Sequence, residues 1–171
     1  MKRFTAILAL ACVASSASAQ ATQPAVPRSE TRREIVAVFI GMNICCYPVS
    51  DSLREPLALV RRQLADQAMR QGAQFRMVGV ALDWSPEEGW EYLRSLGRFD
   101  EVSVGSNWRN GQAEMLMWRD STARPAVPQL VVYEHDVGTS TGAMTFGPRR
   151  TIRTLGAAEI GPWARAGAPL R

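Results

Sequence analysis

Six consecutive apolar residues, Ile35 to Ile40, stand shortly before two adjacent cysteines, Cys45 and Cys46. A continuous apolar run rich in β-branched residues is typical of a strand that is buried on both faces, as in the parallel sheet of an α/β protein. From Leu53 onward, apolar residues recur at helical spacing until Gly72, which is a typical helix stop. The sequence therefore predicts a strand followed by a helix, with the cysteines between them.

The rest of the chain continues this alternation of strands and helices. We predict strands at 75–82, 99–104, 129–133 and 151–155, and helices at 86–96, 112–118 and 157–166. Alternating strands and helices imply right-handed crossovers and parallel strands, whereas two strands joined without a helix imply an antiparallel pair. The prediction is an α/β fold with a central mixed sheet of about four to five strands flanked by helices.

The helix at 86–96 has the clearest start signal. Ser85 precedes Pro86, and Glu88 follows three residues after the serine, so the three form a capping box with proline at the first helical position. We expect Trp90, Leu93 and Leu96 to form the buried stripe of this helix.

The only histidine, His135, follows the strand predicted at 129–133, and we expect it to be exposed in a turn.

The first 19 residues have the pattern of a secretory signal peptide. A positive end, Lys2 and Arg3, precedes an apolar stretch, and Ala17-Ser18-Ala19 is a small-residue cleavage signal. The alternative is a lipoprotein anchored at Cys12, but Ala9-Leu10-Ala11-Cys12 is a poor match to a lipobox. We expect a secreted or periplasmic protein, with no transmembrane segment in the mature chain. We therefore divide the chain into four parts: a signal peptide at 1–19, a flexible leader at 20–33, one domain at 34–166 and a tail at 167–171.

The charge of the chain does not indicate a nucleic-acid partner. The 171 residues include 20 Lys and Arg and 16 Asp and Glu, and the two signal-peptide cations account for half of the excess. The remaining arginines are scattered among acidic residues rather than clustered in one basic run. We therefore expect no nucleic-acid partner.

The order of these elements and four short motifs resemble the thioredoxin fold, most closely the exported, TlpA-like thiol–disulfide oxidoreductases. The resemblance covers about residues 34–166. Four matches carry it: Cys46-Tyr47-Pro48-Val49 stands where that family has Cys-x-Pro-Cys, Pro56 where it has a kinking proline, Val127-Pro128 where it has a cis-proline, and Thr151 to Gly156 where it has its edge strand. The resemblance implies thiol–disulfide exchange on exported protein thiols through Cys46, with Pro48, Val127 and Pro128 bordering the substrate.

The chain departs from that family at two positions of the site. Val49 replaces the second cysteine, and Cys45 stands where tryptophan is usual. Cys45 is a candidate resolving or auxiliary thiol, although a disulfide between adjacent residues is strained, because their α-carbons lie only about 3.8 Å apart. The alternative is that both cysteines pack as small apolar residues at the strand end, in a binding module without redox turnover that holds peptides by strand pairing.

The start of the helix after the cysteines decides how reactive a thiol is there. A helix that begins at Tyr47 or Pro48 places Cys46 at its N-terminus, where backbone N–H groups and the helix dipole stabilise a thiolate. A second start signal, the capping box from Ser52 to Glu55, leaves the thiol in a loop. We favour the earlier start.

With a single histidine the chain lacks the usual zinc-ligand sets, so we predict no metal and no cofactor.

Overall fold

The structure is a computed structural model that describes residues 30–119, 125–140 and 143–171; of residues 30, 44–51 and 140 it describes the backbone only. The predicted signal peptide and most of the predicted leader lie outside the described residues. The elements are β1 (Glu30–Gly41), α1 (Asn43–Arg70), β2 (Gln74–Ala81), α2 (Pro86–Leu96), β3 (Glu101–Val104), η1 (Asn107–Arg109), α3 (Gly111–Ala113), η2 (Glu114–Trp118), β4 (Gln129–Ser140), β5 (Ala143–Phe146), β6 (Arg150–Gly156) and α4 (Ala157–Arg165).

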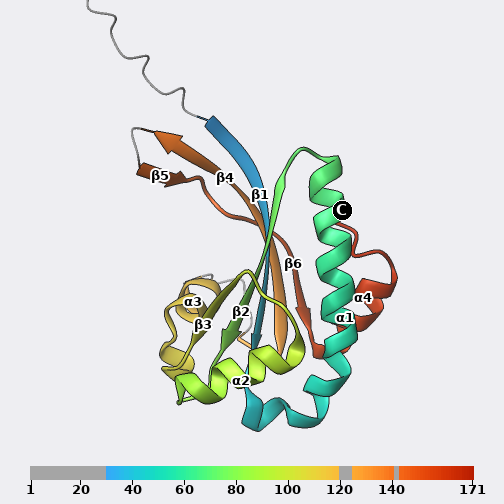
Figure 1. Ribbon diagram of the computed structural model, residues 1–171, viewed down its shortest axis with the longest axis vertical. Coiled ribbons are helices and arrows are strands. Elements are labelled where there is room, and N and C mark those ends of the chain that lie inside the picture. The colour runs from blue at the N-terminus through green and yellow to red at the C-terminus, as the bar shows by residue number, and fades with distance from the viewer. Residues whose placement is uncertain (1–29, 120–124, 141–142) are drawn as a thin grey trace, which may run out of the picture.

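The strands of the described residues form one mixed sheet in the order β3-β2-β1-β4-β5, with β6 also paired to β4 (Figure 1). β1 and β2 are parallel, as are β2 and β3, whereas β4 runs antiparallel to β1. β6 pairs with the first half of β4 and β5 with its last four residues, both antiparallel. The predicted α/β class and mixed sheet flanked by helices are confirmed; the short strand β5 was not predicted.

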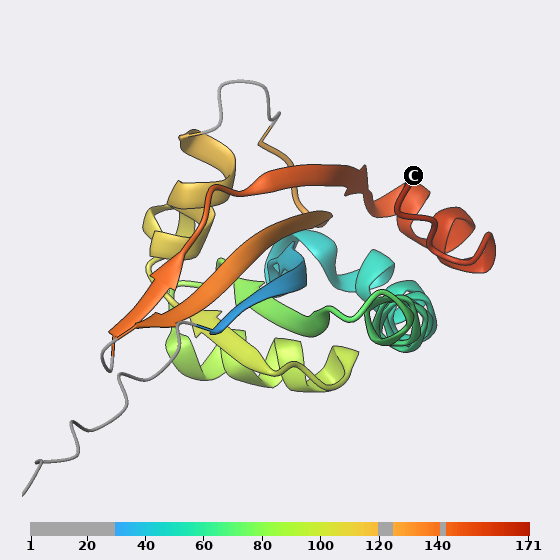
Figure 2. The same cartoon turned by 90° about the horizontal axis from the view of Figure 1, so that it is seen from above.

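Both faces of the sheet are covered, as the uninterrupted apolar run in β1 predicts. One set of alternate β1 residues, Ile35, Ala37 and Phe39, packs with α1, α2 and α4. The other set, Val36, Val38 and Ile40, packs with residues of α3 and η2. Figure 2 shows α1 and α4 together on one side of the sheet and α3 on the other.

α1 begins earlier than either start that the sequence predicts. The helix runs without interruption from Asn43 to Arg70, so the predicted starts at Tyr47 or Pro48 and at Ser52 are both wrong. No side chain at the N-cap position caps this helix; instead the carboxylate of Asp83, forty residues later in the chain, accepts a hydrogen bond from the Asn43 N–H. The helix bends in its first half (Figure 1), the part that contains Pro56, and a proline removes one helix hydrogen bond.

α2 has the predicted bounds but a rotated buried face. Ser85 accepts the expected hydrogen bond from the Glu88 N–H at 3.3 Å, so the predicted N-cap is confirmed. Leu93 and Leu96 are buried as predicted, but Trp90 is 50% exposed. The helix approaches the sheet through Gly89, where an added Cβ would lie 3.0 Å from the Cβ of Ala81. Because Gly89 and Tyr92 complete the buried stripe, the neighbouring Trp90 faces outward.

Two strands, β1 and β4, extend well beyond their predicted bounds. β1 begins at Glu30 and so includes the last four residues of the expected leader. β4 continues past Tyr133 to Ser140, because β1 and β5 pair with its second half. His135 therefore lies within a strand and is only 6% exposed, and the prediction that it is exposed in a turn is wrong.

Candidate functional site

The predicted thiol site lies at one edge of the sheet, at the bottom of Figure 1, where β1 and β2 end and β4 begins. Gln129, the first residue of β4, pairs with Ile40 near the end of β1. The Leu82 N–H donates to the Gly41 carbonyl at 2.8 Å, which joins the ends of β1 and β2. Since α1 begins two residues after Gly41, the helix start and Pro128 come to the same edge.

Cys45 and Cys46 are the third and fourth residues of α1. The first four N–H groups of a helix have no partner within the helix, and together with the helix dipole they favour a thiolate nearby. The side chains of Cys45, Cys46 and Pro48 lie outside the described residues. The backbone therefore places the predicted cysteines in the first turn of a long helix.

Val127 and Pro128 border this edge from the β4 side. Val127 is half-buried against the apolar cluster on the α3 face, and Pro128 is buried. The bond between them is cis, as predicted. The resemblance to the thioredoxin fold also implies that Pro128 lies against Cys46 or Cys45, whose side chains lie outside the described residues.

The carboxylate of Asp83 also lies at this edge, and sequence reasoning missed it. It follows β2 directly and is 1% exposed, and its two oxygens lie 3.1 and 3.3 Å from the Asn43 nitrogen. Burial raises the pKa of Asp83, and the charge of Glu88 adds to the rise, while the hydrogen bond from Asn43 opposes it. Asp83 thus fixes the start of the cysteine-bearing helix. An aspartate that directly follows an apolar strand was the signal in the sequence.

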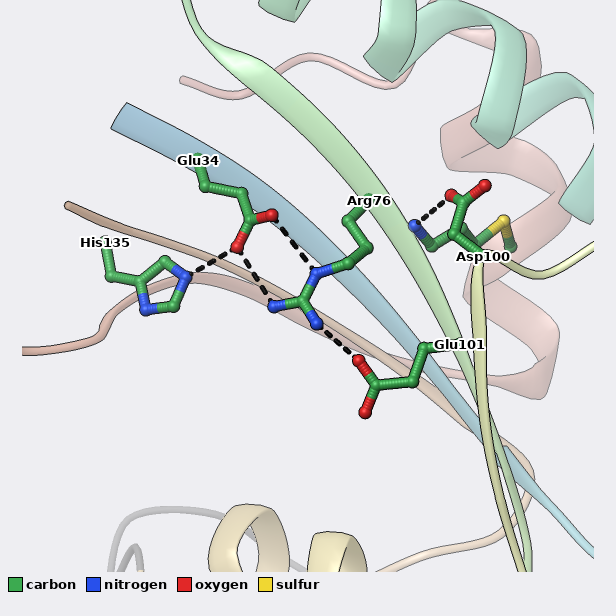
Figure 3. Close-up of polar contacts among 6 residues, drawn as sticks. Glu34, Arg76, Asp100, Glu101 and His135 are labelled. Atoms are coloured by element: carbon green, nitrogen blue, oxygen red, sulfur yellow. Dashed lines mark hydrogen bonds and ion pairs between the residues drawn. The ribbon is translucent and has the colours of Figure 1, made fainter. Parts of the chain in front are cut away.

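A second polar group lies on the sheet face that carries α3, and the sequence did not predict it (Figure 3). Arg76 donates to both oxygens of Glu34, at 3.1 and 3.0 Å, and also pairs with Glu101. Burial would lower the pKa of Arg76, but the hydrogen bond and charge of Glu34 and the charge of Glu101 raise it overall. His135 Nε2 lies 2.8 Å from the same Glu34 carboxylate. The group therefore joins four neighbouring strands of the sheet: β3, β2, β1 and β4.

A cleft of about 470 Å³ opens beside this group, and we call it the β4 cleft. Its apolar lining includes Val38, Val78, Met115 and Phe146, and its polar lining includes Tyr133, His135 and Arg149. The His135 ring stacks on Phe146 with ring centres 5.8 Å apart and meets the edge of Tyr133 at 5.4 Å. The alternation of Val131, Tyr133 and His135 along β4 was the sequence signal that these side chains share one face.

The charged side chains of the β4 cleft differ in whether they have partners. The guanidinium of Arg149 lies 5.1 Å from the centre of the Tyr133 ring, and within the described residues Arg149 makes no ion pair. Burial raises the pKa of Tyr133, and the charges of Arg149 and Arg76 oppose that rise. The cleft therefore holds a buried tyrosine that keeps its proton and a cation without an anionic partner.

Two further observations concern the described residues alone. No three His, Cys, Asp or Glu side chains come together in a way that could hold a metal ion. Nor does any helix combine the length and apolar character needed to cross a membrane.

Comparison with protein-family models, with curated protein sequences and with solved structures finds no match to this chain.

Proposed function

We propose that this chain is an exported thioredoxin-like protein that carries out thiol–disulfide exchange on protein thiols through Cys46. One observation carries the proposal: the backbone of Cys45 and Cys46 lies in the first turn of the helix that follows the central strand β1. A thiolate is favoured at such a position, and the thiolate is the reactive form of cysteine.

The pairing of the strands supports the thioredoxin-like part of the proposal. A parallel β-α-β unit, formed by β1, α1 and β2, is followed by two antiparallel strands, β4 and β6, and a closing helix, α4. That is the arrangement that the resemblance in the sequence implies. Pro128 at the start of β4 stands at the sheet edge where α1 begins, which suits a role beside the thiols.

The exchange has two steps. The Cys46 thiolate attacks one sulfur of a disulfide in an exported protein, so that a mixed disulfide forms and one thiolate of that protein leaves. A second thiolate then attacks the Cys46 sulfur, releases the other thiol of the substrate and leaves Cys46 in a new disulfide with the second thiol. An external dithiol that supplies both electrons returns Cys46 to the thiol form.

The helical backbone bears on which thiol performs the second step. Adjacent residues of a helix point about 100° apart around its axis, and a disulfide between them requires the turn to unwind. We therefore assign the second step to an external thiol and treat Cys45 as an auxiliary thiol that competes only when the first turn of α1 opens.

The rate of alkylation as a function of pH tests the proposal. We would measure it with iodoacetamide in the Cys45→Ser variant, which leaves Cys46 as the only cysteine of the mature chain. Half-maximal reactivity well below pH 8.5, the ordinary value for a free thiol, is expected. Cys46→Ser is the matched control for Cys45. Ordinary or reduced reactivity of Cys46 would contradict redox chemistry and favour the peptide-binding module that uses the Pro128 edge without turnover.

A further inference from the structure

We propose that the β4 cleft is a binding site for a small aromatic carboxylate, separate from the cysteine-bearing edge. The site is formed by Tyr133 and His135 from β4, Phe146 from β5 and Arg149 from the turn between β5 and β6. Its volume of about 470 Å³ lies within the range of small-molecule sites, and a few polar groups converge on an apolar lining.

One cation of the cleft is placed to receive an anion. Arg76 is already neutralised, because Glu34 and Glu101 both pair with its guanidinium. Arg149 is the cation of the cleft that the described residues leave without an anionic partner, and its guanidinium lies over the Tyr133 ring, 5.1 Å from the ring centre. A guanidinium held in this way is suited to a carboxylate, which accepts two parallel hydrogen bonds from it.

The hydroxyl of Tyr133 supplies a second donor to the same place. Tyr133 is only 5% exposed and lines the cleft, and no hydrogen bond joins its hydroxyl to another described residue. Because the protein does not fully enclose this hydroxyl, it can donate a hydrogen bond to a ligand in the cleft. Because Arg149 lies over the ring of this tyrosine, both donors can reach one carboxylate.

The walls of the cleft indicate that the ligand carries an aromatic ring. Phe146 is 60% exposed although it stacks on the buried ring of His135. His135 is itself fixed, because its Nε2 is bound to the Glu34 carboxylate. A flat apolar group that packs against Phe146 and Met115 would cover exposed apolar surface, which favours binding.

Calorimetric titration of the full chain with benzoate tests this proposal. We expect saturable binding with a dissociation constant of about 1 mM, the range for so small a ligand. Benzamide, which has the same shape without the charge, and inorganic phosphate, which has charge without the ring, should each bind at least about tenfold more weakly. A failure of benzoate to bind at up to about 10 mM, or equal binding of benzamide, would overturn the proposal.

Three variants locate the binding within the molecule. Arg149→Gln should weaken benzoate binding about tenfold or more, and Tyr133→Phe, which removes only the hydroxyl, about fivefold. Arg150→Gln is the matched control, because Arg150 pairs with Glu134 and lines a different cavity. Binding that is unchanged in Arg149→Gln and Tyr133→Phe, or weakened equally in Arg150→Gln, would show that benzoate does not bind in this cleft. The result does not depend on the thiols, so Cys46→Ser should bind benzoate as the natural chain does.

Discussion

The carboxylate of Asp83 accepts a hydrogen bond from the backbone N–H of Asn43, the first residue of α1, at 3.1 Å. This contact joins the end of β2 to the start of the helix that carries both cysteines. It replaces the side-chain cap that the residue before the helix, Met42, does not provide. The position of Cys45 and Cys46 in the first turn therefore depends on a residue that is distant in the sequence.

Replacement of Asp83 by asparagine should change how stability depends on pH. Burial raises the pKa of Asp83 in the folded state, so between the unfolded-state value, about 4, and the raised value the folded protein binds more protons than the unfolded chain. The stability of the natural chain therefore falls as pH rises through this window. Asp83→Asn, which keeps an oxygen acceptor for the Asn43 N–H, should not show this loss. Urea unfolding at several pH values measures the difference, and a difference between the two proteins that is constant with pH would contradict the prediction.

Asp100 should have the opposite effect. Burial alone would raise its pKa, but hydrogen bonds from the Arg61 side chain and the Met77 N–H lower it overall, aided by the charges of Arg61 and Arg98. The Met77 hydrogen bond, 2.8 Å long, is drawn in Figure 3. A lowered folded-state pKa contributes stability that is present above about pH 4 and is lost as pH falls through the folded-state value.

Asp100→Asn should therefore lower the free energy of unfolding by about 1 kcal/mol at neutral pH, since Asp100 is partly exposed and its charged hydrogen bonds are weakened by solvent. The difference should shrink as the pH falls below 4. Asp66→Asn on the exposed side of α1 is the control and should leave the free energy of unfolding at neutral pH unchanged. Equal effects of the two substitutions would show that the partners of Asp100 do not stabilise the fold.

The elements that depend on local signals were predicted well. α2 has its predicted bounds because Ser85, Pro86 and Gly97 act within a few residues of the helix ends. The strand at 35–40 was found because a strand covered on both faces leaves an uninterrupted apolar run. These signals reside in neighbouring residues, so the sequence alone displays them.

The features that the sequence did not predict depend on contacts between distant residues. The start of α1 depends on Asp83, and the burial of His135 depends on the Glu34 carboxylate of another strand. The outward position of Trp90 depends on the approach of Gly89 to Ala81. The β4 cleft likewise combines residues from β2, β4 and the turn after β5, which lie far apart in the chain.

Removal of the N-cap at Ser85 should destabilise the protein. The Ser85 hydroxyl accepts from the Glu88 N–H and donates to Glu87 at 2.8 Å. Ser85→Ala should lower the free energy of unfolding by about 1 kcal/mol, as is usual for the loss of such a cap. Ser85→Asp, which restores an N-cap oxygen, should unfold at nearly the same urea concentration as the natural chain. No change in Ser85→Ala would mean that the cap contributes nothing to stability.

Export should remove the first 19 residues. Ala17-Ser18-Ala19 fits the cleavage rule, so the mature chain is expected to begin at Gln20. The intact mass and N-terminal sequence of the protein from an expressing bacterium measure this. A lipid attached to Cys12, with the chain beginning there, is the result that would exclude the soluble exported form.

Introduction of a cysteine at position 49 should restore turnover. Cys46 lacks a partner three residues later, so attack on a substrate disulfide is expected to stop at the mixed disulfide until an external thiol resolves it. Residues three apart in a helix lie on the same face, and α1 is helical across both positions, so a cysteine at 49 can reach the Cys46 sulfur. Val49→Cys should therefore increase the rate of insulin reduction by dithiothreitol about tenfold or more over the weak rate of the natural chain, as expected if intramolecular attack replaces a bimolecular step.

Two variants complete the test of position 49. Val49→Ala, which changes the side chain without adding a thiol, should leave the weak rate unchanged, and Cys46→Ser should abolish it. The mixed disulfide should accumulate in the natural chain and in Cys45→Ser alike, because the helical backbone keeps Cys45 from resolving it. Equal and negligible rates in the natural chain, Cys46→Ser and Val49→Cys would exclude a redox role for Cys46, and the peptide-binding module would then be the better explanation of the cysteine-bearing edge.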